Sequence, residues 1–146
     1  MRIAIHPKER RAIARYGEAA YPGRGYGLLL GRSGENGSHE VIELLPWEQG
    51  RPSQEHEMIP FTEEMLRQGE EIAQQKGLEV IGFFQSNPDY PARPSIQHRT
   101  QALPRYSYVI VGVRKGRAHE LTAWRLSDDR SAFHQIDIRL PEGKKA

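Results

Sequence analysis

The 146-residue chain contains no cysteine, which excludes disulfide bonds and metal sites built on thiolates. It also has no apolar run close to the roughly 20 residues that a membrane-spanning helix needs. The N-terminal stretch, MRIAIHPKERR, becomes charged too early to hold the apolar segment of a signal peptide. We therefore expect a cytoplasmic protein with no membrane partner.

Basic and histidine side chains are not arranged along the sequence as a nucleic-acid or metal site requires. The net charge is only +2, and Lys and Arg form no long run, so no nucleic-acid partner is expected. No two histidines show the H-x-H or i, i+4 spacing of a local metal pair; they are His6, His39, His56, His98, His119 and His134. A metal site assembled from distant segments stays an alternative at this point.

The length of the chain fits one domain, and its 37% of hydrophobic residues can form a core without covalent staples. The sequence contains no internal repeat. We expect a single domain over residues 1–141 and a disordered C-terminal tail over 142–146.

The spacing of apolar residues predicts three helices and seven strands. The helices are expected at 7–20, 62–76 and 95–102, with Pro7, Thr62 and Ser95 as N-terminal signals. The strands are expected at 2–5, 26–31, 41–45, 78–84, 106–113, 120–126 and 133–140, with the first at the edge of the sheet. Loops are expected at 46–57 and 85–94. Hairpins outnumber β-α-β units in this order, which predicts an α+β fold with a curved, mixed sheet flanked by helices.

The strands expected at 26–31 and 78–84 are continuous apolar runs, a pattern typical of strands buried on both faces. Together with the strand at 106–113 they provide most of the expected core, namely Leu28, Leu30, Phe83, Phe84, Val109 and Val111.

Two segments, YPGRGYGLLLG and VIGFFQSNPDYPARPS, resemble signatures of the JAMM (MPN+) metalloprotease family. The segment YPGRGYGLLLG, over 21–31, is similar to the family's strand entry P-x-E-x-x-G-L-L-x-G. The segment VIGFFQSNPDYPARPS, over 80–95, is similar to the family's run V-G-x-x-H-S-H-P-D-x-x-A-x-P-S. The second match is gapless from Gly82 to Ser95, and the order of the two segments is that of the family. The resemblance covers most of the chain and implies the JAMM/MPN fold.

The positions at which the family holds and uses its zinc are all substituted here. By the resemblance, Gln85 and Asn87 replace two histidine ligands, His98 replaces an aspartate ligand, and Arg24 replaces the glutamate that acts as general base. Carboxamides are poor zinc ligands, and an arginine cannot accept a proton near neutral pH. We therefore predict that the chain holds no zinc and is a pseudoenzyme.

The remaining positions of the motif, Ser86, Asp89 and Ser95, match the family. One interpretation is that Arg24 replaces the missing dication, bonded to the carboxamides or to Asp89; the alternative is that it points into solvent. A serine near His98 could also suggest a nucleophile, although a serine with a histidine three residues away is more often a helix cap.

The resemblance implies two kinds of protein partner. One is a β-grasp protein of the ubiquitin-like or sulfur-carrier type, whose Gly-Gly tail adds as a strand along the groove. The other is an active JAMM protein for which this chain is a scaffold; a homodimer is also compatible. The alternative function is a hydrolase of Gly-Gly-tailed proteins with a rearranged site. No cofactor is expected.

Overall fold

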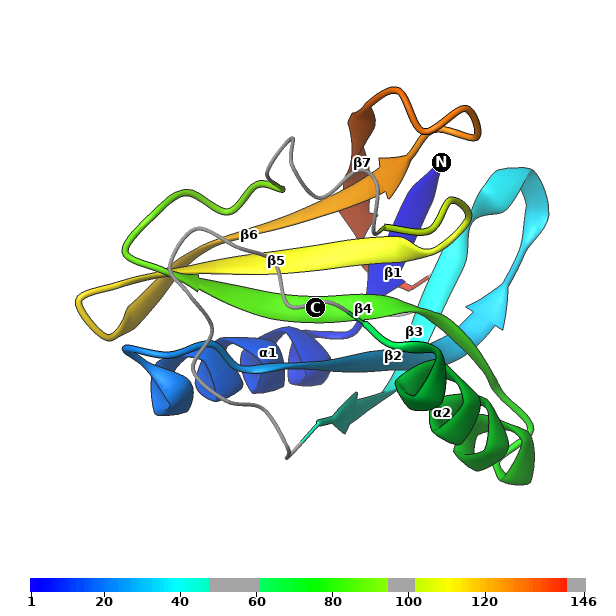
Figure 1. The fold of residues 1–146 in the computed structure, drawn as a ribbon, viewed down its shortest axis with the longest axis horizontal. Coiled ribbons are helices and arrows are strands. Elements are labelled where there is room, and N and C mark those ends of the chain that lie inside the picture. The colour runs from blue at the N-terminus through cyan, green and yellow to red at the C-terminus, as the bar shows by residue number, and fades with distance from the viewer. Residues whose placement is uncertain (48–60, 95–101, 142–146) are drawn as a thin grey trace.

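The computed structural model describes residues 1–47, 61–94 and 102–141. These residues form two α-helices and seven strands, arranged as Figure 1 shows. The helices are α1 (Pro7–Ala20) and α2 (Glu63–Gln75), and the strands are β1 (Arg2–Ile5), β2 (Tyr26–Ser33), β3 (His39–Pro46), β4 (Glu79–Pro88), β5 (Ser107–Arg114), β6 (Arg117–Leu126) and β7 (Phe133–Arg139). A single turn of 3-10 helix, η1 (Glu35–Gly37), joins β2 to β3. The architecture is the predicted α+β fold with a mixed sheet.

Several predictions fall on residues outside the described ranges. These are the short helix at 95–102 apart from its last residue, nearly all of the loop at 46–57, and the tail at 142–146. Within the described part of the chain, neither helix is long and apolar enough to cross a membrane.

The strands form one closed barrel in the order β1-β3-β2-β4-β5-β6-β7. The prediction that residues 2–5 form an edge strand is wrong, because β1 pairs in parallel with both β3 and β7. Alternation of apolar residues reveals a strand but not its neighbours. Here both side chains on one face of β1, Ile3 and Ile5, are fully buried, and pairing on both sides removes the exposed edges.

The two helices cover opposite faces of the sheet, as β2 makes clear. Leu29 packs in the cluster that receives Ile13 of α1, whereas Leu28 and Leu30 pack in the cluster that receives Ala73 of α2. All three leucines have no exposed surface, so β2 is buried on both faces as predicted. The other core residues expected from the sequence are also buried.

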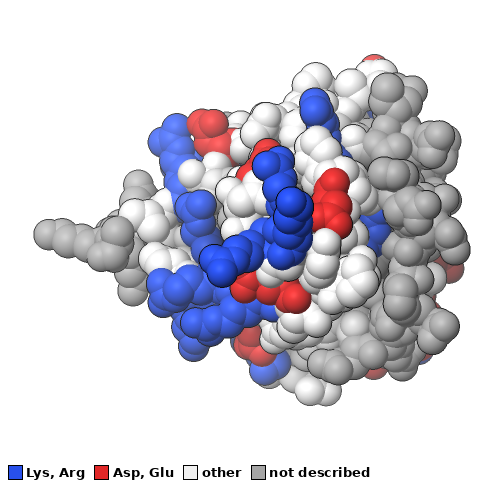
Figure 2. Space-filling model, turned by 90° about the vertical axis from the view of Figure 1, so that its left-hand side faces the viewer, with Lys and Arg blue, Asp and Glu red and all other residues white. Residues whose placement is uncertain are grey.

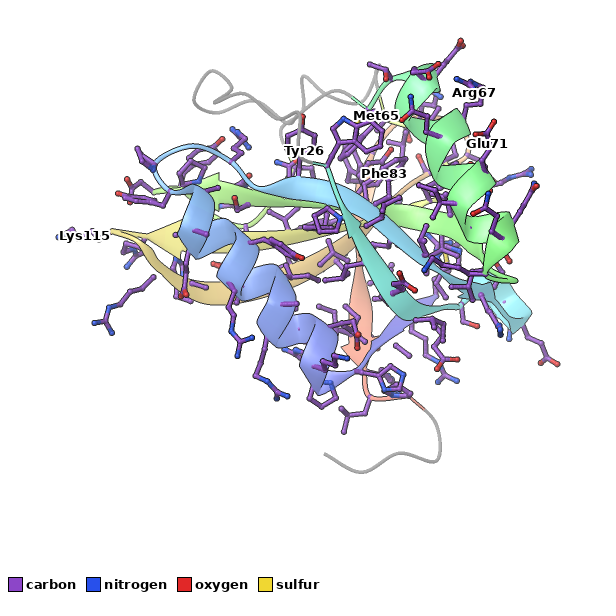
Figure 3. All side chains as sticks on the ribbon, turned by 90° about the horizontal axis from the view of Figure 1, so that it is seen from below. Tyr26, Met65, Arg67, Glu71, Phe83 and Lys115 are labelled. Carbon is purple, nitrogen blue, oxygen red and sulfur yellow. The ribbon has the colours of Figure 1, made fainter. Side chains whose placement is uncertain are left out.

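Local signals explain why α2 begins and ends where it does. The Thr62 side chain accepts a hydrogen bond from Met65 N at 3.1 Å, which satisfies one free donor of the first turn. Gly77 lies just beyond the helix with φ +71, a left-handed conformation that glycine adopts without strain. Figure 3 shows Met65 turned toward Tyr26 and the sheet, while Arg67 and Glu71 form an ion pair on the outer face.

Candidate functional site

The candidate site lies on the C-terminal half of β4, where the sequence predicted a loop. That prediction is wrong over 85–88, because Gln85, Ser86 and Asn87 continue the strand and pair in parallel with β5. All three are polar, so the apolar pattern stops at Phe84, yet each is at most 2% exposed. Polar side chains are buried in a strand when hydrogen bonds satisfy them.

Alternation along β4 places Gln85 and Asn87 on one face, and Arg24 reaches the same face from the segment before β2. The Arg24 guanidinium is only 6% exposed and donates from Nη1 to Asn87 Oδ1 at 2.9 Å. Gln85 Nε2 donates to the same oxygen, also at 2.9 Å. The guanidinium also stands over the Tyr90 ring, 5.2 Å from its centroid. Arg24 is therefore internal, and the alternative that it points into solvent is wrong.

The orientation of the Asn87 carboxamide follows from its neighbours. Its Nδ2 donates to the backbone carbonyls of Pro91 at 2.8 Å and Arg93 at 3.3 Å, which can only accept. Its Oδ1 therefore faces Arg24, which can only donate. Asn87 thus connects the loop after β4 to Arg24, and its amide oxygen already accepts two hydrogen bonds.

Ser86 points to the opposite face of β4 and has a structural role. Its Oγ accepts from Gly25 N at 2.8 Å, which holds the segment carrying Arg24 against the strand. Helix α1 approaches closely here: a Cβ on Gly17 would stand 2.9 Å from Ser86 Cβ and 3.0 Å from Val113 Cγ2. Glycine is required at this helical position because no side chain fits.

Asp89 fixes the loop after β4 to the turn between β5 and β6. It has φ 62, and its carboxylate accepts from Tyr21 Oη at 2.5 Å and from Lys115 N at 2.9 Å. These bonds, the one from Tyr21 first, lower the pKa of Asp89, and the same bond raises the pKa of Tyr21. The site therefore lies beside the β5–β6 turn, whose tip is Lys115 in Figure 3. Figure 2 shows that basic side chains gather at this end of the molecule, with acidic ones between them.

Two predicted site residues, Ser95 and His98, lie outside the described ranges, so the structure does not place them. Within residues 1–47, 61–94 and 102–141, no three His, Asp or Glu side chains gather as a metal site would need. Sequence reasoning missed the contact of Tyr90 with Arg24. The signal that could have indicated it is the position of Tyr90, immediately after the resembling N-P-D residues.

Comparison with known proteins shows the family of the chain. Residues 6–127 match the family described as prokaryotic homologs of the JAB domain, so the chain belongs to that family. A protein from Salinibacter ruber, solved in solution, is 38% identical, with a TM-score of 0.76 over 98% of this chain and 94% of that one. No curated protein matches.

Two more distant structures share the fold. A solution structure from Desulfitobacterium hafniense is 22% identical, with a TM-score of 0.78 over 96% of this chain and 93% of that one. A crystal structure of a JAB1/MPN domain protein from Archaeoglobus fulgidus is 16% identical, with a TM-score of 0.57 over 96% of this chain and 97% of that one.

Proposed function

We propose that this chain is a catalytically inactive JAB/MPN domain that binds another protein. The observation that carries the proposal is the hydrogen bond from Arg24 to Asn87, which joins a buried cation to two carboxamides. By the family resemblance, these residues replace a general base and two metal ligands.

The residues at this position do not fit a zinc ion. Asn87 Oδ1 is engaged by Arg24 Nη1 and Gln85 Nε2, and neutral amide oxygens are weak ligands for zinc. A dication also repels a guanidinium: at about 4 Å and an effective dielectric constant of about 20, the repulsion is about 8 kcal/mol. Arg24 cannot serve as a general base either, since its guanidinium stays protonated. No hydrolytic step through a metal follows from this site.

A rearranged hydrolase is the alternative, and Ser86 is its first candidate nucleophile among the described residues. Ser86 is 1% exposed, and its hydroxyl bonds to the Gly25 backbone. An activated nucleophile needs access to substrate and a base within hydrogen-bond reach. The burial and bonding of Ser86 therefore favour the binding function over hydrolysis.

The chemistry of the surface suggests the class of partner. The site adjoins the end of the molecule where basic side chains gather in Figure 2. Complementary charge steers association, so the partner should present an acidic surface. A β-grasp protein of the ubiquitin-like or sulfur-carrier type with a Gly-Gly tail fits the family resemblance, and an active JAB/MPN protein is the second candidate.

The direct test combines binding and cleavage with one partner. An acidic β-grasp protein that ends in Gly-Gly would be fused to a reporter and titrated against the chain, with a fusion lacking the two glycines as control. We expect saturable binding that needs the tail and weakens with salt, and no release of the reporter with or without chelator. Turnover abolished by chelator would overturn the proposal, and turnover that survives chelator would support the rearranged hydrolase.

A further inference from the structure

A cavity of about 680 Å³ lies at the other end of the β4–β5 pair from the Arg24 site. Ser107, beside this cavity, pairs with Gly82 at the start of the shared ladder, whereas Asn87 pairs with Gly112 near its end. The walls come from the η1 turn, the end of β6 and β7, and they include Gly37, Arg105, Arg125, Leu126, Asp128 and Ile136. Nothing in the family resemblance accounts for this cavity.

Arg125 is a buried cation whose bonds all go to uncharged groups. It is 6% exposed, and its Nη2 donates to Gly37 O at 2.8 Å, His39 Nδ1 at 3.0 Å and Ser107 Oγ at 3.1 Å. Its Nε has no hydrogen-bond partner, and no described carboxylate lies within ion-pair distance. Buried charges are normally paired, so this guanidinium lacks the counter-charge that burial demands.

His39 is neutral, so it is neither a counter-charge for Arg125 nor a second cation beside it. Since Arg125 can only donate, Nδ1 of His39 must be an acceptor, which makes the imidazole neutral. Burial first, and then the charge of Arg125, lower the pKa of His39 to about 4. At neutral pH the cluster of His39, Ser107 and Arg125 therefore carries one positive charge.

The second terminal nitrogen of Arg125, Nη1, has a weak hydrogen-bond acceptor that a ligand could displace. Nη1 donates to the thioether of Met1 at 3.0 Å, and Met1 is 69% exposed. A thioether is a poor acceptor, and an exposed side chain moves aside at little cost. A carboxylate in its place would form a charge-assisted hydrogen bond, which is about twice as strong as a neutral one.

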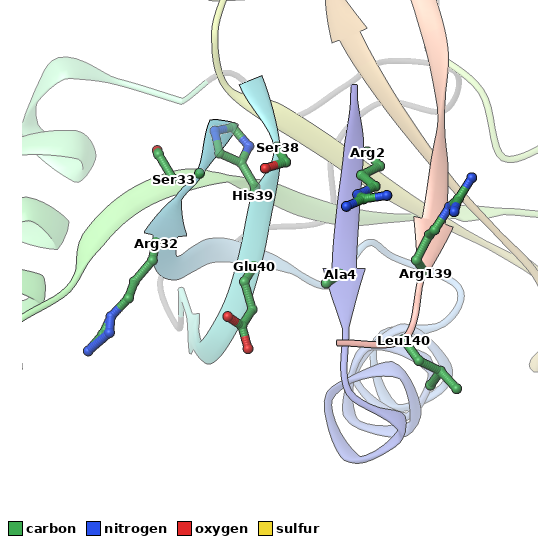
Figure 4. A pocket seen from close by; sticks show the side chains of 10 residues that line it. Arg2, Ala4, Arg32, Ser33, Ser38, His39, Glu40, Arg139 and Leu140 are labelled. Atoms are coloured by element: carbon green, nitrogen blue, oxygen red, sulfur yellow. The ribbon is translucent and has the colours of Figure 1, made fainter. Parts of the chain in front are cut away.

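The surroundings favour a small organic anion. Arg105 adds a second positive charge to the cavity and Asp128 a negative one, while Leu126 and Ile136 add apolar surface. Figure 4 shows the adjoining cavity on the outer face of the sheet, which also borders His39. There Arg2 and Arg139 lie on adjacent strands, with Glu40 on the same pocket wall and Arg139 paired with Asp137 at 3.1 Å.

We propose that the cavity beside Arg125 binds a small organic carboxylate, whose anionic group replaces the Met1 thioether on Arg125 and whose apolar body lies against Leu126 and Ile136.

The test is a nuclear magnetic resonance titration with benzoate, using benzamide at the same ionic strength as its uncharged counterpart. We expect benzoate to shift the amide signals of Gly37, His39 and Leu126 with saturation in the millimolar range, about what a fragment of this size achieves. Benzamide should shift them far less. The pKa of His39 should rise when benzoate binds, because an anion nearby stabilises the imidazolium. Equal effects of the two compounds, or no saturable shift, would refute the proposal.

Variants separate binding from a purely structural role of Arg125. Arg125→Met should weaken benzoate binding at least about tenfold, while Arg117→Met, on the same strand and exposed, should leave it unchanged. If Arg125→Met does not fold, Arg105→Asn is the variant to test. Asparagine tolerates the positive φ of 78 at this position. Loss of the Arg105 cation should weaken benzoate binding about twofold to threefold. Full affinity in Arg105→Asn, or in a folded Arg125→Met, would contradict the assignment. The outcome is independent of whether the Arg24 site is inactive.

Discussion

Replacing Arg24 with methionine tests whether the buried cation stabilises the site. Methionine keeps most of the length of the side chain, so the change removes the charge and its hydrogen bonds more than the packing. The bond from Nη1 to Asn87 Oδ1, at 2.9 Å, is charge-assisted and contributes about 1.5–3 kcal/mol. In this variant Asn87 Oδ1 still accepts the hydrogen bond from Gln85, so the full free-energy cost of a buried acceptor without a donor does not arise. We expect Arg24→Met to lower the free energy of unfolding by about 1.5–3 kcal/mol.

Urea unfolding measures this loss as a shift of the midpoint at constant slope. Arg114→Met is the matched control, because Arg114 is exposed at the end of β5 and should change stability by less than about 0.5 kcal/mol. A double-mutant cycle with Asn87→Ala should give a coupling energy of at least about 0.5 kcal/mol. If Arg24→Met were as neutral as Arg114→Met, with no coupling to Asn87, the guanidinium would not hold this site together.

Three further predictions concern the rest of the fold. Leu29→Ala should lower the free energy of unfolding by about 2–5 kcal/mol, because the side chain is fully buried; a loss below about 1 kcal/mol in urea unfolding would contradict its place in the core. Gly17→Val should destabilise by about 1–3 kcal/mol through overpacking against β4, and an unchanged melting temperature would show that α1 can move away. The pKa of His39 is lowered to about 4 in the folded chain, so as the pH falls His39 takes up a proton in the unfolded chain before it does so in the folded one. Stability should therefore drop by about 2–3 kcal/mol between about pH 6.5 and 4, and His39→Gln should reduce this slope.

Local signals in the sequence were sufficient for the two long helices. Pro7 and Thr62 mark where α1 and α2 begin, and Gly77 marks where α2 stops, because each residue meets a backbone requirement of a helix end. The burial of β2 on both faces could be predicted, because its apolar run is continuous, whereas a strand with one solvent-exposed face alternates apolar and polar residues.

Pairing between distant segments could not be predicted in the same way. The apolar pattern of β4 ends at Phe84, yet the strand continues because Asn87 Oδ1 accepts hydrogen bonds from Gln85 Nε2 and from Arg24 Nη1. The position of Arg24 was indicated by the family resemblance and not by periodicity.

The cluster around Arg125 gave no signal in the sequence. His39 and Ser107 lie 86 and 18 residues away from Arg125 along the chain, and only the closure of the barrel brings them together. Their residue types are common on protein surfaces, so nothing in the local pattern indicated that all three would be buried.

Zinc binding tests the central claim most directly. Calorimetric titration with zinc should give no binding heat for the natural chain. The variant Arg24→Glu, Gln85→His, Asn87→His, His98→Asp should bind about one zinc per chain, since it restores the donors that such sites use. Stoichiometric zinc in the natural chain, removable by chelator together with a peptidase activity, would contradict the claim that Arg24 and the two carboxamides have replaced the metal centre.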